Sequence, residues 1–211
     1  MSSSFDSLIP DARAFLTDLA DNNTRDWFTA QKARYEAELK APALMLLDHL
    51  AQSWGRTIDR PLKTKLFRAN RDVRFSKDKT PYNTHLHMMW TETDGPGWFL
   101  GIATDYVTAG AGVMGFDKAQ LTTWRAAVDG PLGAELQAAI TASGARIDPP
   151  QLKRVPAPYG ADHPLGDLLR RKSLALWHDV AEPAEKLGLV PAAEAAFADL
   201  RPAVDLLRQM T

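Results

Sequence analysis

The sequence predicts a single α+β domain over residues 1–211, in which an antiparallel sheet is flanked by N-terminal and C-terminal helices. Three observations predict this fold. Apolar residues recur at helical spacing near both ends of the chain. Strand-like runs fill the middle, and the connections between them are too short for helical crossovers. A chain of 211 residues is long enough for one large domain, and no internal repeat divides it.

The first quarter of the chain is expected to be helical. A helical pattern opens at Pro10 and stops at Asn22. We expect Asn23 to cap the N-terminus of a second helix. Pro42 is expected to kink or restart that helix, because proline lacks a backbone N–H and clashes with the preceding turn. Gly55 is a suitable residue to follow a last helical turn, so we place the end of the helix there.

The sheet is expected to begin after Pro61. Residues 94–97, with the sequence Asp-Gly-Pro-Gly, predict a turn between two strands. The next two strands are expected to form a hairpin around Asp105 and Tyr106. The predicted strands are residues 65–68, 84–90, 98–103, 107–114 and 173–178.

The second half of the chain predicts further helices. Asp117 is expected to cap a helix that ends at Gly130, and the next helix is expected to end at Gly144. Residues 148–164 contain five prolines and predict an ordered surface loop, which is the only candidate domain boundary. Neither side of this loop looks self-sufficient, so we expect one domain. Apolar residues at helical spacing over residues 192–210 predict the last helix.

The composition excludes several kinds of protein. There are no cysteines, which excludes disulfides, thiolate zinc sites and a cysteine nucleophile. The first residues lack the basic and apolar regions of a signal peptide, so none is expected. The apolar runs are shorter than the about 20 residues that a membrane span needs. We therefore expect a cytoplasmic protein that does not bind membranes, and the sequence indicates neither a cofactor nor an oligomeric state.

The charge of the chain is concentrated in one stretch. The formal net charge is −1, which argues against a protein that binds nucleic acid with its whole surface. Residues 60–79 nevertheless contain eight basic and two acidic residues, so this stretch has a charge of +6 and the rest of the chain −7. The concentration of positive charge is the first indication of a functional site.

Residues 68–82 form the densest motif of the chain. Their sequence is Arg68-Ala-Asn-Arg71-Asp72-Val-Arg74-Phe75-Ser-Lys-Asp78-Lys79-Thr-Pro-Tyr82. It resembles R-x-x-R-D-x-R-F-x-x-D-K-x-x-Y, the signature of a bacterial protein family, the domain of unknown function 2461, at every specified position. Blocks within residues 22–28, 152–156 and 162–172 also resemble this family. The resemblance covers nearly the whole chain, but it implies no activity, cofactor or partner.

The residue types of the motif are those that hold phosphates or carboxylates. Arginine supplies planar bidentate donors, lysine a point charge and tyrosine a phenol. Asp72 is placed to orient one arginine while the others bind a ligand. A second basic patch consists of residues 153–154 and 170–172. It either converges on the same anion site or faces the C-terminal dipole of a short helix. The predicted ligand-binding residues are Arg68, Arg71, Asp72, Arg74, Lys79, Tyr82, Arg154 and Arg171.

Two hypotheses about function remain open. In the first, these residues bind an anionic small molecule with phosphate or carboxylate groups, with or without catalysis on that molecule. In the second, the protein is a non-catalytic interaction module whose arginines and aspartates form a structural ion-pair network. Its partner would then be a protein or a nucleic acid, and nucleic acid is not favoured. No catalytic residue is assigned under either hypothesis.

Two weaker motifs are assigned structural roles. Residues 110–115 match G-x-G-x-x-G, but the expected helix at Asp117 starts after the motif and not within it. We therefore expect a glycine-rich strand, whose glycines let another backbone or a ligand approach closely. His85 and His87 are expected to point to one face of a strand. Without a third defined ligand, we assign no metal site to them.

Overall fold

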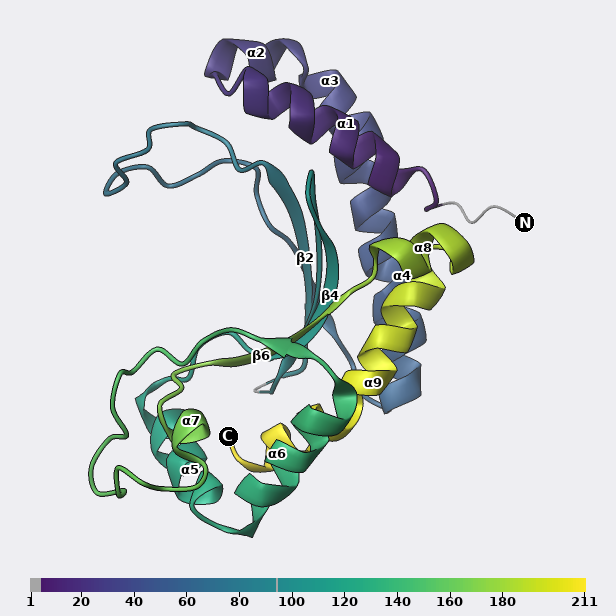
Figure 1. Ribbon diagram of the computed structural model, residues 1–211. Helices are drawn as coiled ribbons and strands as arrows, with labels where there is room; N and C mark the ends of the chain where they lie inside the picture. Colours follow the sequence, from purple (N-terminus) through teal and green to yellow (C-terminus); the bar gives the residue numbers. More distant parts are fainter. Residues whose placement is uncertain (1–4, 94) are drawn as a thin grey trace. The chain divides into compact units, whose positions relative to one another are not determined.

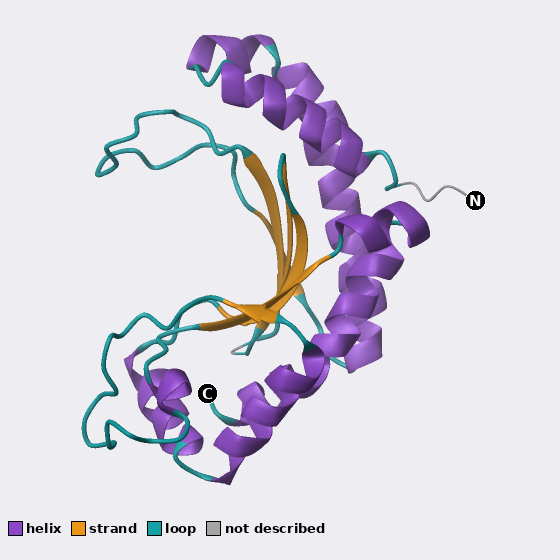
Figure 2. Cartoon of the chain, in the orientation of Figure 1, coloured by secondary structure: helices purple, strands orange, loops and turns teal. Residues whose placement is uncertain are grey.

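The computed structural model describes residues 5–93 and 95–211, and it confirms the α+β class. Helices form the N-terminal and C-terminal parts of the described chain (Figure 1; Figure 2). Asp94 of the expected turn and residues 1–4, which bear on the expected absence of a signal peptide, lie outside the described residues. The elements in chain order are α1 (Leu8–Asp21), α2 (Arg25–Ala30), α3 (Lys32–Arg34), η1 (Tyr35–Lys40), α4 (Ala41–Ile58), β1 (Lys63–Leu66), β2 (His85–Thr91), β3 (Gly97–Ala103), β4 (Val107–Val113), α5 (Lys118–Val128), α6 (Pro131–Ser143), β5 (Arg146–Ile147), α7 (Gly166–Leu169), β6 (Leu174–Asp179), α8 (Ala181–Leu187) and α9 (Leu189–Gln209).

The strands form a six-stranded sheet in the order β1-β2-β3-β4-β6-β5. β1 is therefore an edge strand, and it pairs with β2 in antiparallel fashion, with Lys63 opposite Thr91 and Leu66 opposite Met88. β5 pairs with β6 in the same way. The sequence did not predict β5, because a strand of two residues is too short to show a pattern. The antiparallel sheet expected from the short connections is confirmed.

Buried and half-buried residues alternate along β2, so the strand has two different faces. Every second residue is buried, and one of these residues, Trp90, donates its indole N–H to the Leu47 carbonyl of α4 at 2.8 Å. The intervening residues, among them His85 and His87, are half-buried. Successive side chains of a strand point to opposite faces. The two histidines therefore lie on the face of β2 that is turned away from α4.

The described chain divides into two compact units, each of which combines separate stretches of sequence. The first unit contains the stretch that ends at Thr93, Phe99–Ala109 and Asp179–Glu194, and the second contains the stretch that ends at Trp98, Gly110–His178 and Ala195–Thr211. Residues 148–164, the only boundary that the sequence suggested, lie wholly inside the second unit. The chain does not divide at this proline-rich loop.

Two helix ends differ from the sequence prediction. The cap of α2 is Thr24, whose hydroxyl accepts a backbone N–H of the first turn at 3.3 Å, and not Asn23. α4 continues past Gly55 and stops at Asp59, which adopts the left-handed conformation with φ 54°. A Cβ on Gly55 would lie 3.0 Å from the backbone oxygen of Arg60, so this glycine allows the returning chain to approach the helix. Its role is close packing and not helix termination.

The segment before Pro42 is a π-helix, η1, and α4 begins at Ala41. Pro42 thus lies in the first turn of α4. The π-helix runs directly into this turn, since the Ala41 N–H donates to the Glu36 carbonyl five residues back. Pro42 itself has no N–H to donate. The prediction that Pro42 kinks or restarts the helix is met by this change from π-helix to α-helix at Ala41.

The glycines of β4 permit close packing against β6. A Cβ on Gly110 would lie 2.3 Å from the ring of Trp177, and one on Gly112 would lie 2.0 Å from the carbonyl oxygen of Leu174. Gly112 also has a φ of 137°, which residues with a side chain rarely adopt. The expected glycine-rich strand is confirmed, and its glycines serve the approach of another backbone.

None of the helices in the described part of the chain combines the length and the apolar character needed to cross a membrane. This finding agrees with the short apolar runs of the sequence.

Replacement of Gly112 by alanine tests the packing of β4. We expect Gly112→Ala to lower the free energy of unfolding by about 3 kcal/mol, because the new Cβ overlaps the Leu174 carbonyl and the φ is strained. The matched control is Gly115→Ala, whose Cβ would have no heavy atom within 4 Å. Its effect should stay within about 0.5 kcal/mol. Urea denaturation measures both values, and equal stability of the two variants would contradict the described contact.

Candidate functional site

The sequence motif forms the loop between β1 and β2, residues 67–84, which we call the basic loop. Its two arms are joined by backbone hydrogen bonds, from Arg71 N–H to the Pro81 carbonyl (2.8 Å) and from Asn83 N–H to the Ala69 carbonyl (2.7 Å). Figure 1 shows it as a long loop that leaves the end of β1 and returns to β2. The loop is therefore a ribbon whose arms hold each other, and side chains far apart in the motif meet across it.

Arg71 is tied to residues of the opposite arm. Its Nη1 lies 2.5 Å from Asp78 Oδ2 and also donates to the carbonyl and the hydroxyl of Thr80. The Thr80 backbone N–H, the Arg71 guanidinium and the Thr80 hydroxyl together lower the pKa of Asp78 to about 2. Asp78 is therefore ionised at neutral pH, and its contact with Arg71 braces the two arms of the ribbon.

Asp72 and Arg74 form a second pair within one arm. Nε of Arg74 donates to Oδ1 of Asp72 at 2.9 Å, and Nη2 donates to Oδ2 at 2.6 Å. This bidentate contact is the main cause that lowers the pKa of Asp72. Both side chains are exposed, so the pair orients Arg74 more than it stabilises the fold. The expectation that Asp72 orients one arginine agrees with this geometry.

The remaining bases of the motif form no close ion pair with a carboxylate of the described residues, although Arg68 interacts electrostatically with Asp72. Nζ of Lys79 donates to the Val73 carbonyl at 2.9 Å, which leaves its charge uncompensated. Arg68 and Lys77 are exposed, and neither side chain has a hydrogen bond or an ion pair with the described residues. These three cations are the part of the motif that is open to a ligand.

Tyr82 anchors the basic loop to the N-terminal helices. It is only 7% exposed, and its ring stacks on Phe28 with centroids 4.0 Å apart and planes inclined by 13°. The amide of Asn23 binds the Tyr82 backbone twice, accepting its N–H at 3.1 Å and donating to its carbonyl at 3.0 Å. Asn23, expected as a helix cap, thus pairs with the loop as a neighbouring strand would.

Two phenyl rings of the basic loop are exposed. Phe75, near the tip, is 96% exposed, and the Arg74 guanidinium carbon lies 5.9 Å from its centroid. Phe67, at the root, is 37% exposed, and Nζ of Lys65 lies 4.6 Å from its centroid. Each exposed ring therefore has a cation beside it, a combination that suits anionic ligands with flat apolar parts.

A cluster of rings next to the loop root was not recognised as a unit from the sequence. The rings of His85 and His87 stack with centroids 3.8 Å apart, and Nε2 of His87 lies 2.7 Å from the hydroxyl of Tyr106. Phe67 meets His87 edge-on, with centroids 6.4 Å apart. The expectation that both histidines share one face is confirmed. Tyr106 follows a hairpin turn, and no spacing in the sequence relates it to β2.

Burial sets the protonation of this cluster. It lowers the pKa of His87 to about 4, with the neighbouring His85 as a second cause, and it also lowers the pKa of His85. Burial, followed by the charge of Asp105, raises the pKa of Tyr106. The rings are thus uncharged at neutral pH. Over residues 5–93 and 95–211, no group of three or more histidine, aspartate or glutamate side chains is placed to hold a metal ion.

The second predicted basic patch lies in the other compact unit. Arg171 is 3% exposed and donates Nη1 to the Asp148 carbonyl at 2.6 Å, and burial lowers its pKa. Arg154 is exposed and lines a cavity of about 580 Å³ with His163 and Asp167 among its other lining residues. Convergence of this patch with the basic loop stays a prediction.

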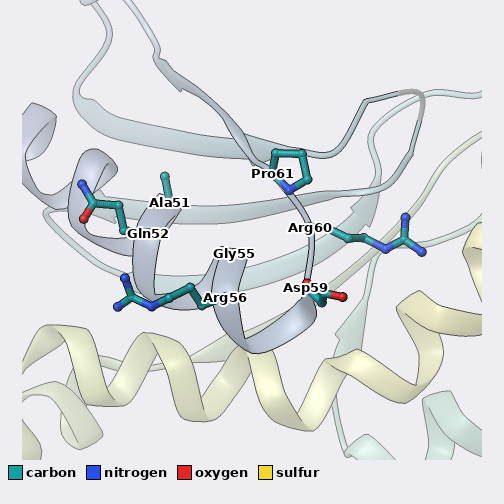
Figure 3. A pocket seen from close by; sticks show the side chains of 7 residues that line it. All are labelled: Ala51, Gln52, Gly55, Arg56, Asp59, Arg60 and Pro61. Atoms are coloured by element: carbon teal, nitrogen blue, oxygen red, sulfur yellow. The ribbon is translucent and has the colours of Figure 1, made fainter.

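A further cavity, of about 390 Å³, lies where α4 turns toward β1. Two arginines line it, Arg56 and Arg60, and in Figure 3 their guanidinium groups point away from each other. Nε of Arg60 lies 3.5 Å from Glu92. The two guanidinium groups do not converge, so we assign no anion site to this cavity.

The comparisons with known proteins give a family and nothing more specific. A family model described as "Conserved hypothetical protein (DUF2461)" matches residues 11–205. No curated protein and no solved structure matches the chain. The matched residues include the basic loop and the two side chains that anchor it, Asn23 and Phe28.

Removal of the Asn23 amide tests the anchoring of the loop. We expect Asn23→Ala to lower the free energy of unfolding by about 2 kcal/mol, because two hydrogen bonds to the Tyr82 backbone are lost. Trypsin should also cleave the variant faster at Lys77 and Lys79. The control is Asn22→Ala, since the Asn22 side chain donates to the Asp18 carbonyl of α1 and, within the described residues, to no part of the loop. If both variants resist trypsin as the wild type does, Asn23 does not hold the loop.

Proposed function

The chain belongs to the family of conserved hypothetical proteins DUF2461, and from the geometry of the basic loop we propose that it binds a phosphate-bearing chain. One observation supports this function above all. The two acidic residues of the loop, Asp72 and Asp78, are both engaged by arginines of the loop itself. The other bases of β1 and the loop form no close ion pair with a carboxylate of the described residues, and only Arg68 interacts electrostatically with one, Asp72. These cations are Lys63, Lys65, Arg68, Lys77 and Lys79.

The motif then contains two kinds of residue. Arg71 and Arg74, with their aspartates, give the ribbon its shape. Arg68 and Lys79 contact the ligand, as the sequence led us to expect. Tyr82 anchors the ribbon and does not face the ligand. A loop shaped before binding loses little conformational freedom when the ligand arrives, which favours affinity.

The placement of the free bases favours an extended ligand. Lys63 and Lys65 lie on the exposed edge strand β1, two residues apart, so they point to the same side with about 7 Å between them. Arg68 follows at the start of the loop, and Lys77 lies on the arm that returns. Cations spread along a ribbon match repeated anionic groups, as in a polyphosphate or a nucleic-acid strand, better than a single small anion.

The proposed function predicts a salt-dependent affinity for polyanions. Fluorescence anisotropy with labelled inorganic polyphosphate and a labelled single-stranded oligonucleotide measures it. For the oligonucleotide, the logarithm of the binding constant should fall with that of the salt concentration with a slope of about −3.5, because each contacted phosphate contributes about 0.7. In the double variant Arg68→Gln/Lys77→Gln the slope should weaken by about 1.4.

The control is Lys186→Gln, because the Lys186 ammonium is exposed on α8 and pairs with Glu182. This variant should keep the wild-type slope. If the protein binds neither polyphosphate nor the oligonucleotide at low salt, the proposed function is contradicted. The lysines of β1 would then serve only to keep an edge strand from pairing with other chains.

A further inference from the structure

The ring cluster, which consists of Phe67, His85, His87 and Tyr106, is continuous with the proposed track of cations. Phe67 is the first residue of the basic loop, and its N–H donates to the His87 carbonyl at 2.9 Å. Nζ of Lys65 lies 4.6 Å from the centroid of Phe67. A ligand that follows the cations from β1 into the loop therefore passes the edge of this cluster.

Gly101 of β3 allows the rings to lie close to the sheet. A Cβ at this position would lie 3.1 Å from Cδ2 of His87 and 3.2 Å from Cε2 of Tyr106. These distances are tighter than ordinary contacts, so a side chain there would displace both rings. The absence of that side chain lets His87 and Tyr106 rest on the strand and keep their hydrogen bond of 2.7 Å.

The cluster is suited to stacking and not to binding phosphate. Both histidines are uncharged at neutral pH, since burial lowers their pKa values, to about 4 for His87. An uncharged imidazole is no counterion, but it presents a flat face. Phe67 is 37% exposed, although a ring that served only the core would be covered. Rings beside a row of cations are the arrangement that binds single-stranded nucleic acids.

We propose, on the basis of the proposed function, that the ring cluster stacks against unpaired nucleobases, so that the phosphate-bearing chain is a single-stranded nucleic acid. A duplex does not fit, because its bases stack on one another and their faces are covered. The cations hold the phosphates, and the rings of Phe67 and His87 contact the base faces. Stacking of this kind tolerates any base, so the binding is expected to show little sequence preference.

The test compares two twelve-residue strands with the same phosphates, an oligothymidine and an abasic strand that lacks every base. With wild-type protein, the oligothymidine should bind at least about tenfold more tightly, since one stacked base is worth that factor. In Phe67→Leu and in His87→Leu this ratio should fall toward one, while the salt slope stays unchanged. The control His49→Leu, an exposed histidine of α4, should keep the wild-type ratio.

The outcomes separate the two proposals. Equal affinity of the wild type for both strands would overturn the stacking inference and leave the proposed function intact. No binding of either strand would overturn the stacking inference, and absence of binding to inorganic polyphosphate as well would overturn the proposed function. The comparison of the two strands uses the wild-type chain alone, so it can overturn the inference even if a variant does not fold.

Discussion

Two hydrogen bonds between the Asn23 amide and the Tyr82 backbone join the N-terminal helices to the returning arm of the basic loop. The stacked ring of Phe28 covers the same tyrosine, so the contact is both polar and apolar. Without this anchor, an 18-residue connection between β1 and β2 would lose its fixed root. The position of the tip with Phe75, and of the cations on both arms, depends on it.

The charged residues of the anchored ribbon have two roles: some hold its shape, and others are proposed to bind the ligand. The two carboxylates of the loop are held by Arg71 and Arg74. The Thr80 backbone N–H, followed by Arg71, lowers the pKa of Asp78, and Arg74 lowers that of Asp72. The lysines of β1 and the loop have no carboxylate partner among the described residues, so their charge faces solvent or a ligand. A purely structural ion-pair network accounts for the arginines but not for the lysines without a carboxylate partner.

Local sequence patterns predicted the helix ends that depend on interactions between residues close together in the sequence. Asp117 was expected to cap α5, and it does so in a capping box with Gln120. Gly144 ends α6 in the left-handed conformation, as expected. Asn23 was misassigned because its competing partner, the Tyr82 backbone, lies 59 residues away in sequence. Tyr106 was missed for the same reason, since only the folded hairpin brings it to His87.

The central claim is that the acidic residues of the loop act as braces, and the titration of Asp78 tests it most directly. A carboxyl group with a lowered pKa in the folded state contributes stability above its unfolded pKa, and this contribution is lost as the pH falls through the folded value. Carboxyl ¹³C NMR should therefore give a midpoint of about 2 for Asp78. The Arg71→Gln variant should show a higher midpoint. A wild-type midpoint near the ordinary 3.8, unchanged in Arg71→Gln, would contradict the brace and with it the division of roles within the motif.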